Sequence, residues 1–270
     1  MKAILRSGCL ALAILTLAVP ANAGPFDDGV AAAQRGDYAT ALEIWIPLAG
    51  QGDARAQFTL GIMYAEGRGV PQDHADAAWW YRKAAEQGHA LAQYRLGRMY
   101  RRGQGVPEDD AEAVTWYRKA AEQGHAPAQY RLGQSYRLGR GVPQDDAEAV
   151  AWFRKAAEQG YARAQALLGM TYADGRGVPQ DDAEAVTWWR MAAEQGLAEA
   201  QIHLGLMYHK AQGVPQDNVL AHMWLNLAAS QLPPGEQRDV AIRFRDVLAR
   251  QMTLDQLAEA QRPPVRWVNY

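Results

Sequence analysis

Several residue types that common chemistries require are scarce in this sequence of 270 residues. The only cysteine is Cys9, and beyond position 23 the only serines are Ser135 and Ser230. Disulfides, thiolate catalysis and cysteine-ligated zinc are therefore excluded for residues 24–270. No Ser, His and Asp are arranged as a nucleophile with its base, and no G-x-G follows a predicted strand. We therefore expect no catalytic site and no cofactor.

The sequence also lacks a large excess of either charge. It has 28 basic and 30 acidic side chains, and 49% of its residues are hydrophobic. This composition is typical of a folded protein and argues against bulk disorder and against nucleic-acid binding. The apolar stretch at residues 9–19 would rise about 16 Å as a helix, against a hydrocarbon core of roughly 30 Å. We therefore expect no transmembrane anchor.

The first 23 residues have the pattern of a secretory signal peptide. Lys2 and Arg6 precede the apolar stretch, and Ala21 and Ala23 form a small-residue cleavage site ahead of Gly24. The sequence therefore predicts an exported protein, periplasmic or secreted, that begins at Gly24 after cleavage.

A repeat with a period of 36 residues covers residues 52–231. Glycine, tyrosine and tryptophan recur at fixed positions within it, the tryptophans at Trp80, Trp116, Trp152, Trp188 and Trp224. The predicted copies are 52–87, 88–123, 124–159, 160–195 and 196–231.

Each copy has the periodicity of two amphipathic helices. In the first copy, a loop rich in glycine and proline at 67–72 separates them, Asp73 occupies an N-cap position, and Gly88 follows the second helix. The first four copies also have an acidic residue three positions after the capping aspartate, as in a capping box. One hairpin is too small to bury Trp80, so we expect the hairpins to stack.

Two further positions recur inside the predicted first helices. The glycine at Gly61 costs about 1 kcal/mol in a helix, which we explain by a tryptophan or a neighbouring backbone pressing against it. A glutamine recurs four residues earlier, where an amide could bond backbone groups between repeats; we favour this structural role over ligand contact. The glutamines are Gln57, Gln93, Gln129, Gln165 and Gln201.

These positions resemble the Sel-one-like repeat family, relatives of tetratricopeptide repeats. The family pattern is A-x-x-x-L-G-x-x-Y, then G-x-G-V-x-x-D, then A-x-x-W-x-x-x-A-A, and all five copies are similar to it. The resemblance implies an all-α, right-handed superhelical α-solenoid that acts as a protein-interaction scaffold, with first helices lining a concave surface. The first instance is Ala56, Leu60, Gly61, Tyr64, Gly67, Gly69, Val70, Asp73, Ala77, Trp80, Ala84 and Ala85.

The flanking segments are predicted to cap the stack. Residues 27–51 form a shorter hairpin without the glycine-rich loop. Residues 232–262 contain two helices, the second opened by a capping box from Thr253 to Gln256. The tail at 263–270 has no periodicity.

An Arg and Tyr patch on the predicted first helices is the candidate binding site. Arginine pairs bidentately with carboxylates, and tyrosine adds rigid contact area. We expect a protein or peptide partner with acidic residues. The alternative is a solvated helix face whose arginines pair with Glu86, Glu122 or Glu158. The patch comprises Tyr94, Arg95, Arg98, Arg102, Tyr130 and Arg131.

No metal site is predicted. His203 and His209 are six residues apart and point to different sides of a helix, whereas His89 and His125 stand at predicted helix starts. Helix capping explains the loop carboxylates, which lack the alternating oxygen ligands of a calcium loop.

Two alternatives to the scaffold stay open. Resemblance to cysteine-rich exported relatives implies a β-lactamase-like or other cell-wall hydrolase activity, although their disulfides are missing here. A module that binds peptidoglycan or another glycan could stack sugars on Trp79, Trp189 and Tyr94.

Overall fold

The computed structural model describes residues 24–262, so the predicted signal peptide and the tail at 263–270 lie outside the described residues. Within residues 24–262 the chain forms fourteen helices and no strand. The helices are α1 Pro25–Gln34, α2 Tyr38–Gly50, α3 Ala54–Glu66, α4 His74–Glu86, α5 Ala90–Arg102, α6 Asp110–Glu122, α7 Ala126–Leu138, α8 Asp146–Glu158, α9 Ala162–Asp174, α10 Asp182–Glu194, α11 Ala198–Lys210, α12 Asn218–Gln231, α13 Glu236–Ala249 and α14 Leu254–Ala260.

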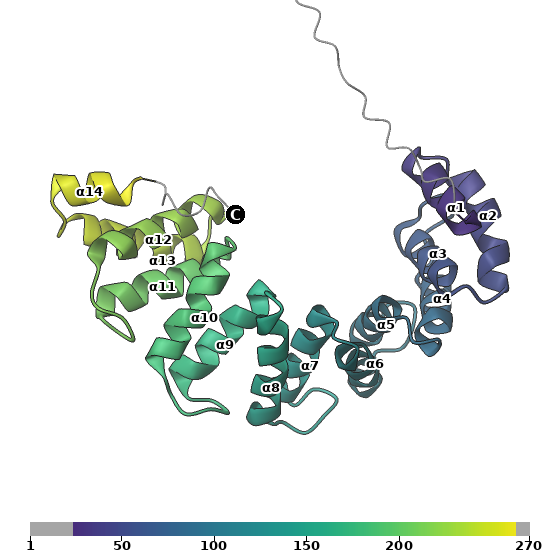
Figure 1. Cartoon of the computed structure of the whole chain (residues 1–270), viewed down its shortest axis with the longest axis horizontal. Helices are drawn as coiled ribbons and strands as arrows, with labels where there is room; N and C mark the ends of the chain where they lie inside the picture. The colour runs from purple at the N-terminus through teal and green to yellow at the C-terminus, as the bar shows by residue number, and fades with distance from the viewer. Residues whose placement is uncertain (1–23, 263–270) are drawn as a thin grey trace, which may run out of the picture.

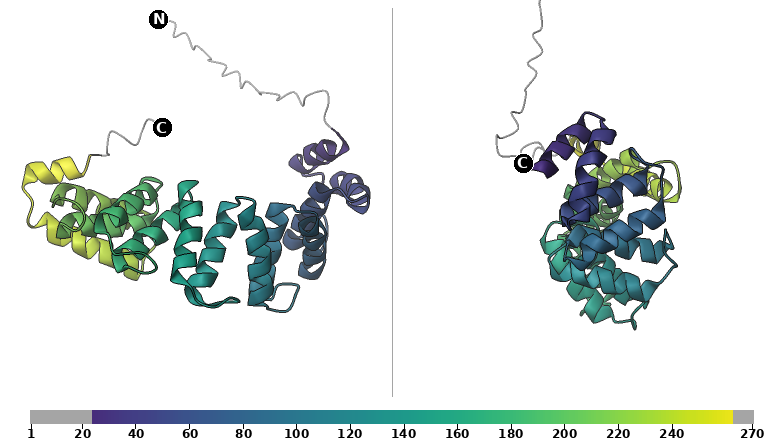
Figure 2. Two further views of the ribbon diagram at one scale, coloured as in Figure 1. Left: turned by 60° about the horizontal axis from the view of Figure 1, so that its bottom comes forward. Right: turned by 90° about the vertical axis from the view of Figure 1, so that its right-hand side faces the viewer.

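The helices follow one another along an open arc (Figure 1). Each repeat contributes a first and a second helix, from α3 with α4 to α11 with α12, and each second helix packs against the first helix of the next repeat. The hairpin of α1 and α2 covers α3 at one end, and α13 and α14 pack on α12 at the other. Two further views show the stack from its side and along its length (Figure 2). The predicted α-solenoid of 36-residue hairpins is confirmed.

The second helices begin where the sequence indicates. Asp109 precedes α6, and its Oδ1 accepts hydrogen bonds from the N–H groups of Ala111 and Glu112, both at 2.9 Å. The aspartates before α4, α8 and α10 make the same pair of bonds. The first helices end at a residue in the left-handed conformation, which is glycine in four repeats and Ala211, with a φ of 54°, in the fifth.

The tryptophan of each second helix packs into the hydrophobic cluster at the seam between its own repeat and the hairpin before it. Trp116 of α6 joins the cluster built from α4 and α5, and Trp152 of α8 joins the cluster built from α6 and α7. Trp116, Trp152 and Trp224 are buried, whereas Trp80 and Trp188 are partly buried. Stacking therefore buries the rings that a single hairpin could not, as predicted.

The mid-helix glycines lie under a different side chain from the one we expected. A Cβ at Gly97 would stand 2.8 Å from the ring of Tyr117, the residue after the repeated tryptophan, and 3.0 Å from the carbonyl oxygen of Ala113. The rings at the other repeats are Tyr81, Phe153 and Trp189, and Leu225 takes this place in the fifth. A tryptophan thus presses on the glycine only at Trp189, and the general cause is a close crossing of the two helices of one hairpin.

The repeated glutamines form a ladder between repeats. Gln129 donates from Nε2 to the carbonyl oxygen of Ala121 at 3.1 Å and accepts on Oε1 from Gln159 Nε2 at 2.7 Å. Gln57, Gln93 and Gln165 make the corresponding two bonds. The side chains are buried, which confirms the structural role.

A second bond crosses every seam between consecutive repeats. Arg118 of α6 donates from Nη2 to the hydroxyl of Tyr136 in α7 at 2.7 Å, and its guanidinium lies 5.7 Å from the centre of that ring. The same arginine and tyrosine pair recurs as Arg82 with Tyr100, Arg154 with Tyr172, and Arg190 with Tyr208.

Candidate functional site

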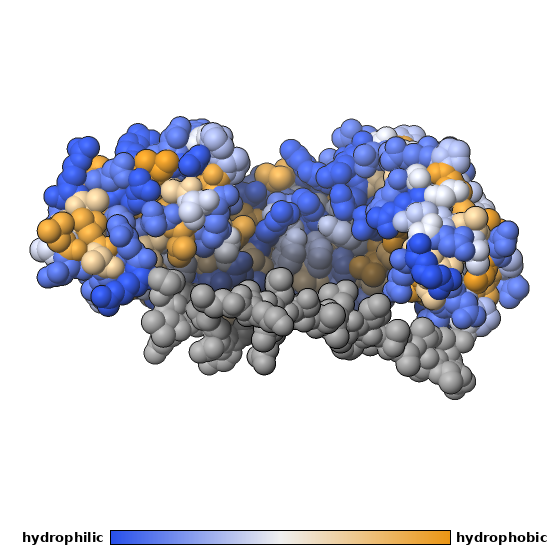
Figure 3. Space-filling view, turned by 90° about the horizontal axis from the view of Figure 1, so that it is seen from above, coloured by the Kyte–Doolittle hydropathy of each residue, from blue (hydrophilic) through white to orange (hydrophobic). Residues whose placement is uncertain are grey.

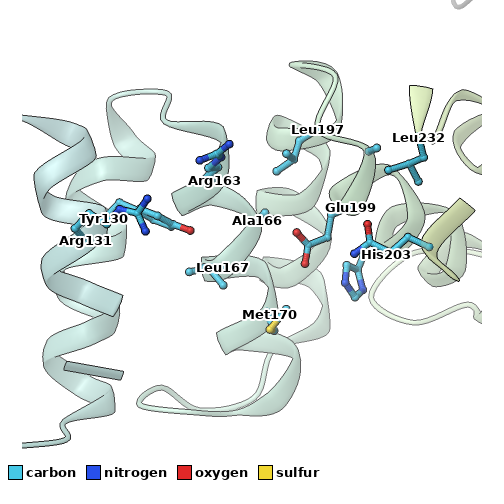
Figure 4. A pocket seen from close by; sticks show the side chains of 12 residues that line it. Tyr130, Arg131, Arg163, Ala166, Leu167, Met170, Leu197, Glu199, His203 and Leu232 are labelled. Carbon is cyan, nitrogen blue, oxygen red and sulfur yellow. The ribbon is translucent and has the colours of Figure 1, made fainter. Parts of the chain in front are cut away.

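Three consecutive first helices line one cavity of about 350 Å³ (Figure 4). Tyr130 and Arg131 come from α7, Arg163 and Met170 from α9, and Glu199 from α11. Other lining residues are Ala166, Leu167, Leu197, Ala198 and His203, with Leu232 and Gln237 from the segment after α12. The cavity therefore lies on the surface that α7, α9 and α11 share. We call this surface, extended to include α5, the first-helix surface.

The cavity lies where one repeated aromatic side chain is missing. The same position of the first helix holds Phe58, Tyr94 and Tyr130 in the first three repeats, Ala166 in the fourth and Ile202 in the fifth. Each of the three rings packs against a ring that precedes the next first helix. The ring centroids lie 4.6 Å apart for Phe58 with His89, 4.8 Å for Tyr94 with His125 and 5.3 Å for Tyr130 with Tyr161. At Ala166 no ring fills this position, and Leu197 stands where the partner ring would be.

The two walls of the cavity differ in charge. Tyr130 and Glu199 point toward one another across it, and Arg131 and Arg163 lie on the side of α7 and α9 (Figure 4). Burial raises the pKa of Tyr130, and the neighbouring Arg131 opposes that rise. One wall is therefore basic, the other carries a carboxylate, and the floor is apolar.

His203 lies beside Glu199 on the same wall of the cavity (Figure 4). Its ring stacks on the indole of Trp189, with centroids 4.7 Å apart and an interplanar angle of 7°. Burial lowers the pKa of His203, and Glu199 and Asp174 only partly offset this effect. Trp189 in turn donates from Nε1 to the carbonyl oxygen of Ala166 at 3.1 Å, which fixes the floor of the cavity.

The tyrosines of the predicted patch are held by neighbours. Tyr94 is partly buried, and the guanidinium of Arg98 lies 5.8 Å from its ring centroid. Tyr130 is only 9% exposed, and its hydroxyl accepts a hydrogen bond from Gln134 Nε2 at 2.9 Å. Tyr94 and Tyr130 therefore offer a partner less exposed surface than the sequence indicated.

The arginines of the patch extend from α5 to the cavity. Arg95 and Arg98 are partly buried and Arg102 is exposed at the end of α5. Arg131 lies 5.5 Å from the ring of Tyr130 and donates from Nη1 to Gln134 Oε1 at 2.9 Å. It also lines a second, smaller cavity of about 80 Å³ with Arg101 and Arg140.

Among residues 24–262, none of the patch arginines forms an ion pair with Glu86, Glu122 or Glu158. The ion pairs of residues 24–262 are Arg55 with Asp53, Arg68 with Glu66, Arg176 with Asp174, and Arg245 with Asp246. All four join residues one or two positions apart in the chain, and none includes an arginine of the patch or Arg163. The arginines of the patch, and Arg163, therefore face this surface without a carboxylate partner in the part of the chain that the structure describes.

Four of the residues that line the cavity were not predicted from the sequence. They are Arg163, Glu199, Leu232 and Gln237. Alignment of the five repeats contains the signal for the cavity, because Ala166 is small where three repeats have a ring. Nothing in the repeat pattern places residues 232–237 on the first-helix surface, because they lie outside the repeats.

The aromatic residues proposed for glycan stacking do not form a site. Trp189 is only 3% exposed and its indole N–H is bonded, so the prediction for Trp189 is wrong. Trp79 is 52% exposed, on the second helix of the first repeat. Within residues 24–262 no three His, Asp or Glu side chains gather as metal ligands, and none of the helices there is long and apolar enough to cross a membrane.

Comparison with known proteins assigns the chain to a family. The Sel1 repeat model matches residues 54–89, 90–125, 126–161, 162–197 and 198–231, which is more than half of the chain. The protein therefore belongs to the Sel1 repeat family, whose members generally serve as protein-interaction scaffolds, typically without catalytic activity.

A solved structure agrees with this assignment. A Sel1 repeat protein from Oxalobacter formigenes is 39% identical, with a TM-score of 0.74 over 77% of this chain and 86% of that one. A protective antigen with an SLR fold from uropathogenic Escherichia coli is 30% identical, with a TM-score of 0.41 over 88% of this chain and 66% of that one. No curated protein matches.

Proposed function

We propose that this protein is an exported, non-catalytic scaffold that binds an acidic segment of a partner protein along the first-helix surface. The observation that carries this proposal is a row of arginines on α5, α7 and α9 beside a cavity shared by three repeats. These arginines have no carboxylate partner among residues 24–262.

Charge and shape both support an acidic protein segment. Guanidinium groups bind carboxylates bidentately, and a partly buried arginine gains more from such a pair than an exposed one. Seen from above, the molecule is hollowed between its two ends, and polar and apolar side chains mix there (Figure 3). An extended or helical segment lying in this hollow would cross several repeats, which is how solenoids use their concave surfaces.

Charge reversal tests the proposal. Crosslinking in the cells that produce the protein identifies the captured partner, and the purified pair is then compared with the double variant Arg98→Glu with Arg131→Glu. We expect at least roughly tenfold weaker binding with unchanged helical circular dichroism. The matched control is Arg68→Glu with Arg176→Glu, which makes the same change of charge at loop arginines already paired locally. Equal binding by both double variants would contradict the proposal.

Export rests on residues 1–23 and has its own test. The n-region, apolar stretch and Ala21–Ala23 site support cleavage before Gly24. Mass spectrometry of the protein from a cell-envelope or culture fraction should show an N-terminus at Gly24. A protein that retains residues 1–23 in the cytosolic fraction would refute this part.

A further inference from the structure

We propose that the cavity at Ala166 is an anchor site for one aromatic side chain of the bound partner segment, with an adjacent acidic residue of that segment held by Arg131 and Arg163. This inference rests on the proposed function and adds to it the chemistry by which a partner is recognised.

The chain itself shows which side chain fits this position. Phe58, Tyr94 and Tyr130 place a ring at the equivalent point of the first three repeats, each against the ring before the next helix. The backbone around Ala166 repeats that geometry, since α9 and α11 continue the same stack. An external ring would therefore occupy the position that an internal ring occupies in the other repeats, with Leu197 in place of the partner ring and Met170 as a further apolar contact.

The charges around the cavity select the residue beside the ring. Arg131 and Arg163 have no carboxylate partner among residues 24–262, so they are free to form ion pairs with a carboxylate of the ligand. Glu199 on the opposite wall repels such a carboxylate and accepts a hydrogen bond from an indole or phenol group. The two walls thus orient an aromatic residue with its acidic neighbour toward α7.

The same charges argue against the chain's own tail as the occupant. Residues 263–270 include Trp267 and Tyr270, but this segment has no Asp or Glu and carries Arg266. Binding it would bring a third arginine beside Arg131 and Arg163, with no carboxylate side chain and only the α-carboxylate of Tyr270 to pair with them. A partner segment that is both aromatic and acidic satisfies both features of the cavity.

Methionine methyl NMR gives a local readout of this site. Met170 lines the cavity, whereas Met63 is buried between α3 and the N-terminal cap, far along the arc. The probe is a short fluorescein-labelled peptide with one tryptophan flanked by aspartates. The control peptides replace the tryptophan by alanine or the aspartates by lysines. We expect saturable binding of the first peptide, a shift of the Met170 methyl signal but not of Met63, and at least roughly tenfold weaker binding of both controls.

Filling the cavity is the decisive variant. Ala166→Tyr installs the ring that Tyr94 and Tyr130 supply elsewhere, and it should weaken the peptide at least roughly tenfold. The matched control, Ala151→Tyr, adds the same side chain at an exposed position of α8 where the first repeat carries Trp79, and it should bind normally. Should Ala166→Tyr disturb the fold, Arg163→Glu, at an exposed residue, should still weaken the aspartate peptide and strengthen the lysine peptide.

Several outcomes overturn the inference. The first is that the wild-type protein does not bind the peptide, and the second is that Ala166→Tyr binds it equally well. A Met170 signal that changes with Trp267→Ala would assign the cavity to the tail. A Met170 signal that changes with protein concentration would assign it to a second copy of the chain. Capture of the native partner that survives Ala166→Tyr but is lost in the Arg98 and Arg131 double variant would refute the anchor and leave the proposed function standing.

Discussion

Replacing Gln129 by methionine tests whether the glutamine ladder is structural. The change keeps the length and shape of the side chain but removes both of its hydrogen bonds. The carbonyl oxygen of Ala121 loses this partner but keeps the N–H of Gly124 at 3.0 Å, so its loss is about 0.5–1.5 kcal/mol. Gln159 loses its bond to Oε1 but keeps the one to Lys155, so its loss is about 0.5–1 kcal/mol. The apolar side chain recovers part of this, and we expect a net loss of about 1.5 kcal/mol in the free energy of unfolding.

The fifth repeat provides the matched control. Gln201 donates to the carbonyl oxygen of Ala193 at 3.2 Å, but its Oε1 is buried without a partner. Gln201→Met therefore breaks one bond and also removes an unsatisfied oxygen, so it should cost about 1 kcal/mol less than Gln129→Met.

Urea unfolding followed by circular dichroism measures both variants, and hydrogen exchange of α7 and α8 shows whether the loss is local. Gln129→Met should leave partner binding unchanged. A variant as stable as Gln201→Met, or one that loses binding while stability is retained, would refute the structural role of the ladder.

Two further predictions concern stability. His89 and His125 accept N-cap hydrogen bonds while neutral, and burial lowers the pKa of both below the usual value of 6.5. As the pH falls, these histidines therefore take up protons in the unfolded chain at a higher pH than in the folded protein. The free energy of unfolding should be constant above pH 6.5 and should decrease as the pH drops below 6.5. Asparagine at both positions, which keeps a capping oxygen, should flatten this dependence in thermal melts; an unchanged slope would contradict the assignment. Ala211→Gly should stabilise the protein by about 0.5 kcal/mol, because relief of left-handed strain exceeds the added entropy of the unfolded chain, and a lower urea midpoint would refute this.

The fold could be predicted because the same residues that begin helices and join repeats recur in each copy. Asp109 at a helix start and Gln93 at a seam are local or periodic signals, and both make the predicted bonds. The pressure on Gly97 was predicted in part. The carbonyl oxygen of Ala113 is the neighbouring backbone that was expected, but the ring is Tyr117 and not Trp116, because periodicity places the two side by side and does not decide which of them turns toward the first helix.

The candidate site was harder to predict for two physical reasons. A cavity is defined by a side chain that is missing, so Ala166 carries no signal until it is compared with Tyr94 and Tyr130. The approach of Gln237 to the first-helix surface depends on the curvature of the whole stack, which no single repeat encodes. The lack of carboxylates around Arg98 likewise follows from where α5 lies in the stack, and not from the spacing of charges along the chain.

The arginine and tyrosine bond that recurs at each seam has a mechanical consequence. Four similar joints share any deformation of the arc, so a small rotation at each adds up to a large change in the distance between its ends. A change of curvature distributed over all four seams therefore asks less of each bond than the same change concentrated at one seam.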